Sequence, residues 1–134
     1  MRVIETFFDA QRNHIHLEIT VKNSHGMEYS LDAILDTGAP VTEISDQFLA
    51  FTGFIPFPNE KISIKSGLQS QKYSRITIPE ISICSNIINE FNVYVSYFDE
   101  SWGIDALIGL DFFREYIVEI DYSKGVIKTK NFDV

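Results

Sequence analysis

Hydrophobic and polar residues alternate along much of the chain, and this period of two is typical of β-strands with one buried face. The clearest run places an apolar side chain at every second position, at Ile15, Leu17, Ile19 and Val21. Turn-forming residues follow at 23–26, so residues 29–35 are predicted to return as the second strand of a hairpin. The same alternation predicts further strands over residues 62–64, 73–78, 81–83 and 91–95.

Shorter apolar runs complete the expected strands. Residues 41–44 and 106–108 each predict a short strand, and residues 106–108 are expected to be buried. Residues 117–121 and 126–130 flank the turn signal of residues 122–125, which indicates a second hairpin.

Two segments favour helix instead. Ser45 and Asp46 are good N-cap residues for a short helix over residues 47–52, and residues 110–116 can form one or two helical turns. The pattern as a whole predicts a mainly β protein with one or two short helices.

Composition narrows the class of protein. A chain of 134 residues fits one domain, 1–134, and 45% hydrophobic with 22% charged residues is typical of a globular protein. The net charge of −8 repels phosphate groups, so neither nucleic acid nor an anionic membrane is expected as a partner.

Cellular location can also be predicted. The single cysteine, Cys84, excludes an intrachain disulfide and is expected to be a small core residue, which suits a reducing compartment. No apolar run approaches membrane-spanning length and no signal-peptide pattern opens the chain, so the predicted location is cytoplasmic.

One tetrapeptide carries candidate chemistry. The apolar run Ala33-Ile34-Leu35 leads into Asp36-Thr37-Gly38-Ala39, which occurs once. Asp36 offers an acid/base carboxylate and Thr37 a hydroxyl that can reach a neighbouring copy. Gly38 and Ala39 leave room for an amide and a substrate to approach. The same residues also suit an ordinary turn. If the motif is catalytic, one carboxylate cannot be acid and base in the same step. The other must come from elsewhere, and a second copy of the chain is the simplest source.

A second motif, Leu107-Ile108-Gly109, alone reads as a buried strand that ends at a glycine. In this order the two motifs resemble the retropepsin-like aspartic proteases, especially single-domain bacterial and Ddi-type members. The resemblance implies a small closed β-barrel fold in which Asp36 is catalytic and Thr37, Gly38 and Ala39 support the catalytic turn. Leu107, Ile108 and Gly109 would pack beneath that turn.

The resemblance extends to a flap. The family places this substrate-covering hairpin between the two motifs, where the polar, glycine-bearing tip with Ser66, Gly67 and Leu68 gives candidate substrate contacts. Apolar wall candidates, which suggest hydrophobic residues beside the cut, are Ile64, Leu68 and Ile108. Two residues depart from the family: Pro40 stands where Ser or Asp is common, and Leu110 replaces an Arg of viral members.

The implied activity is that of a homodimeric aspartic endopeptidase acting on peptides or proteins. Two Asp36 carboxylates about 4 Å apart would repel by about 4 kcal/mol at an effective dielectric constant of about 20, so the pair is expected to share one proton. The ionised member activates a water molecule and the protonated member hydrogen-bonds the peptide carbonyl. Neither a metal nor a cofactor is required. Terminal residues 3–8 or 126–130 are candidates for the dimer sheet.

Other interpretations remain open. A catalytically silent dimeric module that binds peptides or proteins fits the same fold, and Pro40 favours it, whereas the complete tetrapeptide at Asp36 favours the enzyme. His14 and His16 share one side of a strand but lack a recognised zinc-ligand spacing, so surface histidines are expected. The acidic residues Asp99, Glu100 and Asp105 near Trp102 are expected to form a solvated loop.

Overall fold

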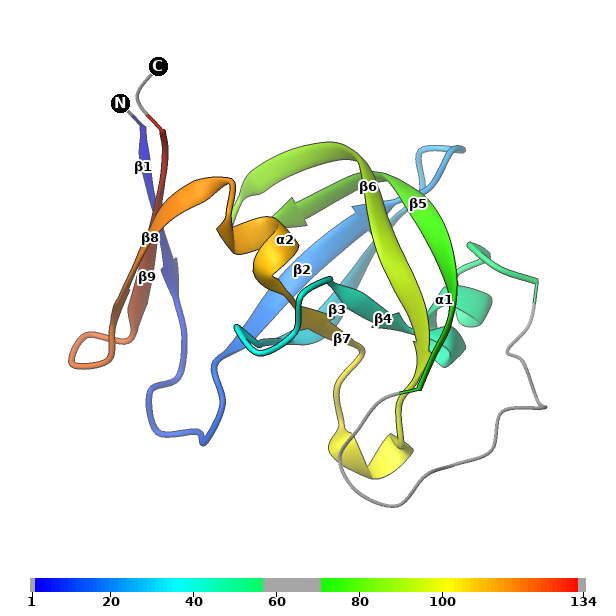
Figure 1. Cartoon of the computed structure of the whole chain (residues 1–134), viewed down its shortest axis with the longest axis horizontal. Coiled ribbons are helices and arrows are strands. Elements are labelled where there is room, and N and C mark those ends of the chain that lie inside the picture. The colour runs from blue at the N-terminus through cyan, green and yellow to red at the C-terminus, as the bar shows by residue number, and fades with distance from the viewer. Residues whose placement is uncertain (1, 57–70, 133–134) are drawn as a thin grey trace.

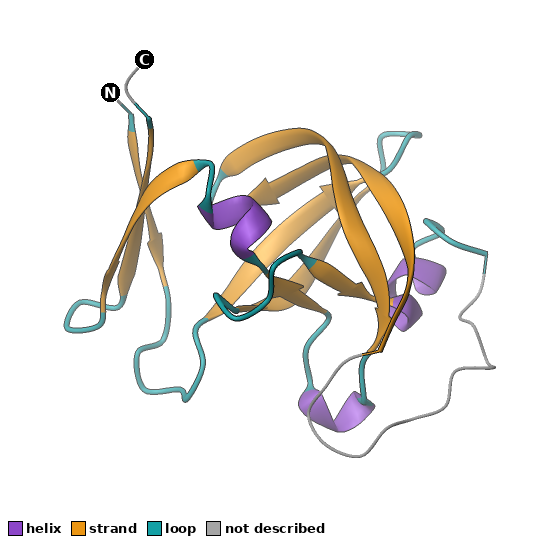
Figure 2. Cartoon of the chain, in the orientation of Figure 1, coloured by secondary structure: helices purple, strands orange, loops and turns teal. Residues whose placement is uncertain are grey.

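The computed structural model describes residues 2–56 and 71–132 of the chain, with the side chains of 71–73 left out. Two β structures lie side by side: a closed six-stranded barrel and a separate three-stranded sheet (Figure 1). Within the described residues, two short α-helices and one 3-10 helix connect the strands (Figure 2). The predicted fold class, a mainly β closed barrel with one or two short helices, is confirmed.

Strand order around the barrel is β2-β3-β7-β4-β6-β5, and the separate sheet has the order β1-β9-β8. The barrel strands are β2 (His16–Lys22), β3 (Glu28–Leu35), β4 (Glu43–Ser45), β5 (Gln71–Ile83), β6 (Asn86–Tyr97) and β7 (Ala106–Ile108). The strands of the separate sheet, here called the terminal sheet, are β1 (Val3–Phe7), β8 (Tyr116–Asp121) and β9 (Val126–Asn131). The helices are α1 (Asp46–Phe51), η1 (Glu100–Trp102) and α2 (Leu110–Phe113).

The first predicted hairpin is present as β2 and β3, which pair antiparallel with Leu17 opposite Ala33. All four apolar residues of the predicted alternation, Ile15, Leu17, Ile19 and Val21, are buried in the barrel core. Because side chains alternate between the two faces of a strand, this register leaves Glu18 exposed to solvent.

The predicted helix after Ser45 is also present. Ser45 caps α1, since its Oγ accepts a hydrogen bond of 3.4 Å from the Phe48 amide. The second helix, α2, is shorter than predicted. It ends at Phe113, and β8 begins at Tyr116, because the chain there turns directly into the terminal sheet.

A single long strand, β5, contains both predicted segments 73–78 and 81–83, and it pairs with β6 to form one wall of the barrel. Residues 62–64, together with the flap candidates Ser66, Gly67 and Leu68, lie outside the described residues.

The terminal sheet packs against the barrel through the turn between β5 and β6. The Asn86 side-chain amide donates a 3.0 Å hydrogen bond to Thr129 Oγ1, and both Thr129 and Ile127 are buried. Cys84, at the same turn, is buried as expected. Burial raises the pKa of its thiol above the ordinary value.

The strand that positions the candidate site is β7. It runs parallel to β3 and antiparallel to β4, so it lies between the two segments that flank residues 36–42. This pairing places Ile108 beside Leu35 although the two residues are far apart in sequence.

Candidate active site

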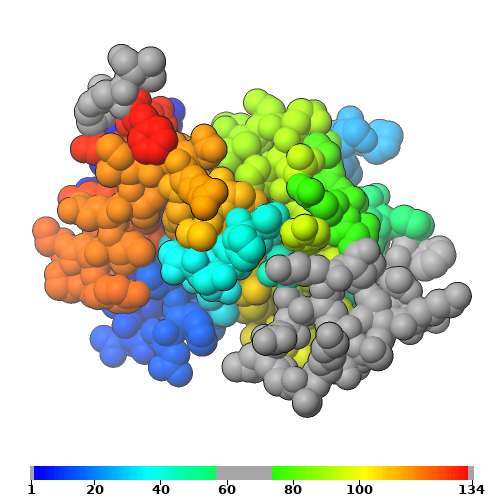
Figure 3. Space-filling view, in the orientation of Figure 1, coloured from blue at the N-terminus to red at the C-terminus, as the bar shows by residue number. Residues whose placement is uncertain are grey.

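Asp36 stands at the end of β3, where the chain leaves the barrel wall in a tight turn. The Asp36 amide donates to the Ile108 carbonyl at 2.9 Å, and the Ala39 amide donates back to the Asp36 carbonyl at 3.1 Å. Thr37 and Gly38 are exposed, Asp36 is half-buried and Ala39 is buried. In the space-filling view this cyan segment lies at the surface, between the blue N-terminal residues and the orange residues of α2 and β8 (Figure 3).

The Asp36 carboxylate is oriented by its own turn. Its Oδ1 accepts a 2.9 Å hydrogen bond from the Gly38 amide. A Cβ atom added to Gly38 would stand 3.2 Å from the same oxygen, which is closer than ordinary contact. A glycine at this position therefore lets the amide reach the carboxylate without crowding it.

The second motif lies directly alongside this turn. Leu107 and Ile108 pair with Ile34 and Leu35 across the β3–β7 ladder, and the Leu110 amide donates to the Ala39 carbonyl at 2.8 Å. A Cβ atom on Gly109 would come within 2.7 Å of the Val41 carbonyl carbon and 2.8 Å of the Ala39 oxygen. Only a glycine allows the two backbones to approach this closely.

One expectation about these residues is wrong. Ile108 was expected to contribute to a substrate-facing wall, but its side chain is 0% exposed and belongs to the barrel core. Its neighbour Leu107 is half-buried and points to the other side of β7, as the alternation of a strand requires.

Comparisons with known proteins identify the architecture. No protein-family model and no curated protein sequence matches the chain. Among solved structures, a retropepsin-like aspartic protease from Rickettsia conorii superposes with a TM-score of 0.62 at 15% identity, covering 96% of this chain and 89% of the other. The retroviral protease-like domain of Ddi1 from Leishmania major gives a TM-score of 0.58 at 16% identity, covering 91% and 96%. This chain has a retropepsin-like fold. The resemblance inferred from the two motifs is thereby confirmed at the level of the fold.

Within the retropepsin-like fold, two residues that sequence reasoning missed join the two motifs. Thr42 is fully buried, and its Oγ1 donates to Asp111 Oδ1 at 2.7 Å while its amide donates to Asp111 Oδ2 at 3.0 Å. The Gly109 amide in turn donates to Thr42 Oγ1 at 3.1 Å. The sequence offers one weak signal, a threonine within the apolar run of residues 41–44, but nothing that pairs it with Asp111.

The histidines and the acidic loop lie away from this turn. His14 is exposed, and His16 Nδ1 lies 3.3 Å from Asp32 Oδ2. No group of three potential metal ligands occurs within residues 2–56 and 71–132. No helix in the same ranges is long and apolar enough to cross a membrane.

The acidic residues near Trp102 do not form the single solvated loop that was expected. Asp105 instead joins the barrel, since its Oδ2 accepts from the Asp32 amide at 3.2 Å and its own amide donates to the Asp32 carbonyl at 2.8 Å. Asp99 caps η1 by accepting from the Ser101 amide at 2.9 Å, and this hydrogen bond holds the pKa of the carboxyl below its usual range.

Proposed function

We propose that this chain is a homodimeric aspartic endopeptidase, with residues 1–134 as one protease domain. The observation that carries the proposal is the position of Asp36 on a retropepsin-like fold. Its half-buried carboxylate lies on a turn at the surface and is oriented by the Gly38 amide, while its backbone amide is held by the Ile108 carbonyl. The single, buried cysteine and the lack of any possible intrachain disulfide support a cytoplasmic site of action.

The proposed chemistry uses one Asp36 from each of two subunits. Like charges at short distance disfavour double ionisation, so the pair holds one proton. The ionised carboxylate accepts a proton from a water molecule while the water oxygen bonds to the carbon of the scissile peptide. The protonated carboxylate donates a hydrogen bond to the carbonyl oxygen. The tetrahedral intermediate then collapses: the C–N bond breaks, and the carboxyl that took the proton from water gives it to the leaving nitrogen, so the pair again holds one proton. The residues present supply every group in this scheme, with no metal or cofactor.

The strand arrangement favours β1 over β9 as the strand at which the second copy pairs; β8, at the opposite edge of the same sheet, also pairs only with β9 among the described strands. Both neighbours of β9 come from its own chain, because β9 is the middle strand of the order β1-β9-β8. Among the described strands, β1 pairs only with β9, so its outer edge offers unused backbone groups to another strand. Of the two segments considered from sequence, residues 3–8 are therefore the better candidate.

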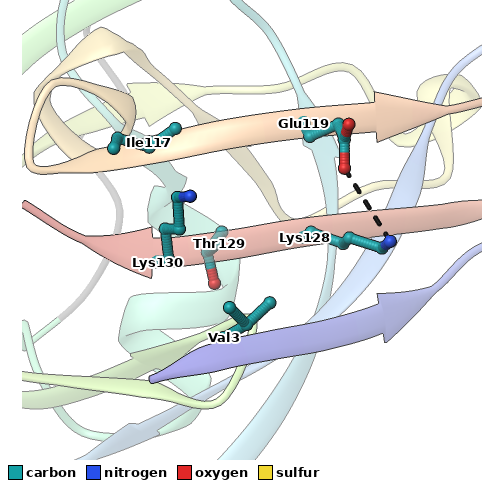
Figure 4. A pocket seen from close by; sticks show the side chains of 6 residues that line it. All are labelled: Val3, Ile117, Glu119, Lys128, Thr129 and Lys130. Carbon is teal, nitrogen blue, oxygen red and sulfur yellow. Dashed lines mark ion pairs between the residues drawn. The ribbon is translucent and has the colours of Figure 1, made fainter. Parts of the chain in front are cut away.

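Side chains near this edge are compatible with a self-complementary contact. The outward face of the terminal sheet carries a hollow lined by Val3, Ile117, Glu119, Lys128, Thr129 and Lys130 (Figure 4). Lys128 Nζ lies between two carboxylates, 4.0 Å from Glu5 and 3.9 Å from Glu119. Alternating charges of this kind can pair with their own copies across a two-fold axis.

A peptide library incubated with the protein between pH 4 and pH 7 tests the proposal. Cleavage products detected by mass spectrometry should vanish in Asp36→Asn, because the amide cannot take the proton from water. Glu28→Gln is the matched control, since it removes one negative charge from an exposed position of the same strand. Activity should rise faster than linearly with protein concentration while the dimer is only partly formed.

The competing function is a dimeric peptide- or protein-binding module without turnover. Pro40 favours it, since this exposed residue lacks the amide that could hydrogen-bond near the carboxylate. Peptides that stay intact at every pH, with a folded dimer demonstrated by sedimentation, would support the binding module and refute the enzyme.

A further inference from the structure

A single peptide unit lies between the two motifs and is held on both sides. The carbonyl of Ile108 accepts from the Asp36 amide at 2.9 Å, and the N–H of the same unit, on Gly109, donates to Thr42 Oγ1 at 3.1 Å. Because a peptide unit is planar and rigid, fixing its N–H also fixes the direction of its carbonyl. The Thr42 hydroxyl therefore acts on the carbonyl that holds the backbone of Asp36.

Asp111 fixes the Thr42 hydroxyl in turn. Its carboxylate accepts three hydrogen bonds, from Thr42 Oγ1 at 2.7 Å, from the Thr42 amide at 3.0 Å and from the Phe112 amide at 2.9 Å. With its hydrogen committed to Asp111, Thr42 Oγ1 presents lone pairs to Gly109. The carboxylate also belongs to the first turn of α2, where negative charge is favourable.

The chemical identity of both residues matters to this arrangement. All three groups that face the Asp111 carboxylate are hydrogen-bond donors. In an asparagine, the N–H₂ group would face one of these donors, and two donors cannot form a hydrogen bond. A valine at position 42 would keep the shape of threonine but leave the buried Gly109 amide without its acceptor. Serine would preserve the hydroxyl.

We propose that Thr42 and Asp111 are positioning residues that set the place of the Asp36 carboxylate in the shared catalytic centre. This inference rests on the proposed function. Neither side chain needs to touch substrate: both act through the Ile108–Gly109 peptide unit. A shift of about 1 Å in a reacting group can lower a rate by about 100-fold, so small movements of this unit have large effects.

The experiment compares Thr42→Val with Thr42→Ser in the full-length dimer, at concentrations where sedimentation shows complete dimerisation. Thr42→Val should lower kcat by about 100-fold with a smaller change in KM, whereas Thr42→Ser should keep most of the activity. The pH range of activity should also narrow in Thr42→Val, because carboxylates that move apart share one proton over a shorter range. Circular dichroism at each pH checks that the variant stays folded, because a loss of stability can also narrow that range.

Amide hydrogen exchange supplies a readout that does not depend on activity. Exchange of the Gly109 amide should accelerate by about tenfold or more in Thr42→Val, relative to amides of β2, and stay near the wild-type rate in Thr42→Ser. If Thr42→Val does not fold, Asp111→Asn takes its place and is expected to show the same changes, since one of the two oxygens that accept from Thr42 becomes an N–H₂ group, which cannot accept.

The outcomes separate this inference from the proposed function. The positioning role is overturned if the wild type is active and a folded Thr42→Val or Asp111→Asn variant keeps its kcat, its pH range of activity or its slow exchange of the Gly109 amide. A wild type that cleaves nothing overturns the endopeptidase itself, and the catalytic role of the pair with it. In that case the exchange rate of the Gly109 amide still shows whether the Thr42 hydroxyl holds the Ile108–Gly109 peptide unit in place.

Discussion

Two glycines of the candidate site differ in what surrounds them. A Cβ atom on Gly38 would meet only the end of the Asp36 side chain, 3.2 Å away. A Cβ atom on Gly109 would meet backbone atoms of Ala39 and Val41 at 2.7 to 2.9 Å. A side chain can rotate away from an added methyl group, whereas a hydrogen-bonded backbone cannot. A substitution at Gly38 therefore tests the orientation of the Asp36 carboxylate, whereas a substitution at Gly109 tests the packing of the fold.

Substituting alanine at each glycine should give distinct results. Gly109→Ala should lower the free energy of unfolding by about 1–3 kcal/mol, as overpacking of a tight contact does, and activity should fall with it. Gly38→Ala should leave the free energy of unfolding within about 1 kcal/mol of wild type, since its backbone does not require glycine. It should still reduce cleavage, because Asp36 must turn away from the new methyl group.

Urea denaturation of both variants, followed by the peptide-cleavage assay, checks this pair. Equal stability losses in the two variants would show that the turn is not packed as described. A fully active Gly38→Ala would mean that the orientation of the Asp36 carboxylate by the Gly38 amide is not required for cleavage.

At the scale of single elements, the turn of the β8–β9 hairpin is held by hydrogen bonds to one carboxylate. Its turn is held by Asp121, whose Oδ1 accepts from Ser123 Oγ at 2.6 Å and from the amides of Ser123 and Lys124 at 2.9 and 3.2 Å. These donors, with the Ser123 hydroxyl first, hold the pKa of the Asp121 carboxyl below its ordinary value.

The stability of this turn should depend on pH with a defined sign. Because the folded-state pKa is lowered, the contribution of Asp121 is complete above the ordinary aspartate pKa of about 3.9 and is lost as pH falls through the lower folded value. NMR titration of the Asp121 carboxyl should give a midpoint below about 3.9, and Ser123→Ala should raise that midpoint. Asp99 is the internal control, because it accepts from Ser101 and not from Ser123. If Ser123→Ala raised the titration midpoints of both Asp121 and Asp99, the Ser123 hydroxyl would not be the cause of the low pKa of Asp121.

Sequence reasoning succeeded for elements whose contacts are local. The alternation from Ile15 to Val21 predicts both the β2 strand and its buried face, and Ser45 marks the start of α1, because strand period and helix capping are properties of neighbouring residues. The order of the two motifs indicated the retropepsin-like fold, but by resemblance and not by local physics.

The same reasoning failed where partners are distant in the chain. Asp105 was assigned to a solvated loop, although it forms hydrogen bonds with Asp32. The hydrogen bond from Thr42 to Asp111 was not predicted. In both cases the sequence does not show which strands become neighbours. Residues 106–108 were correctly predicted to form a buried strand, but Ile108 was also named as a wall residue beside the substrate, since a three-residue strand is too short for its alternation to show which side chain faces the core. The roles of Asp36, Thr37, Gly38 and Ala39 in catalysis remain predictions.

At the scale of the whole molecule, the terminal sheet and α1 lie on opposite sides of the barrel (Figure 1). Exposed apolar side chains occur at both places. Val3 and Phe7 on β1 are 50% and 73% exposed, and Phe51 on α1 is 89% exposed. If β1 forms the interface between two copies, its exposed residues should affect association and Phe51 should not.

Lysine substitutions at these positions test that arrangement. Val3→Lys with Phe7→Lys should weaken dimerisation by about tenfold or more, because each added charge occurs twice in a symmetric interface. Phe51→Lys, the matched control, should sediment and cleave like wild type. A double variant that still dimerises at wild-type concentrations would exclude β1 as the interface.

The parallel pairing of β3 with β7 also constrains the order of events during synthesis. The hydrogen bond from the Asp36 amide requires Ile108, and the Thr42 hydroxyl requires Asp111, so neither can form while those residues are still inside the ribosome. Translation adds about 5–20 residues per second, which leaves several seconds between the emergence of the two halves. A nascent chain therefore carries its aspartate without the scaffold that orients it until residues 108–111 have also emerged.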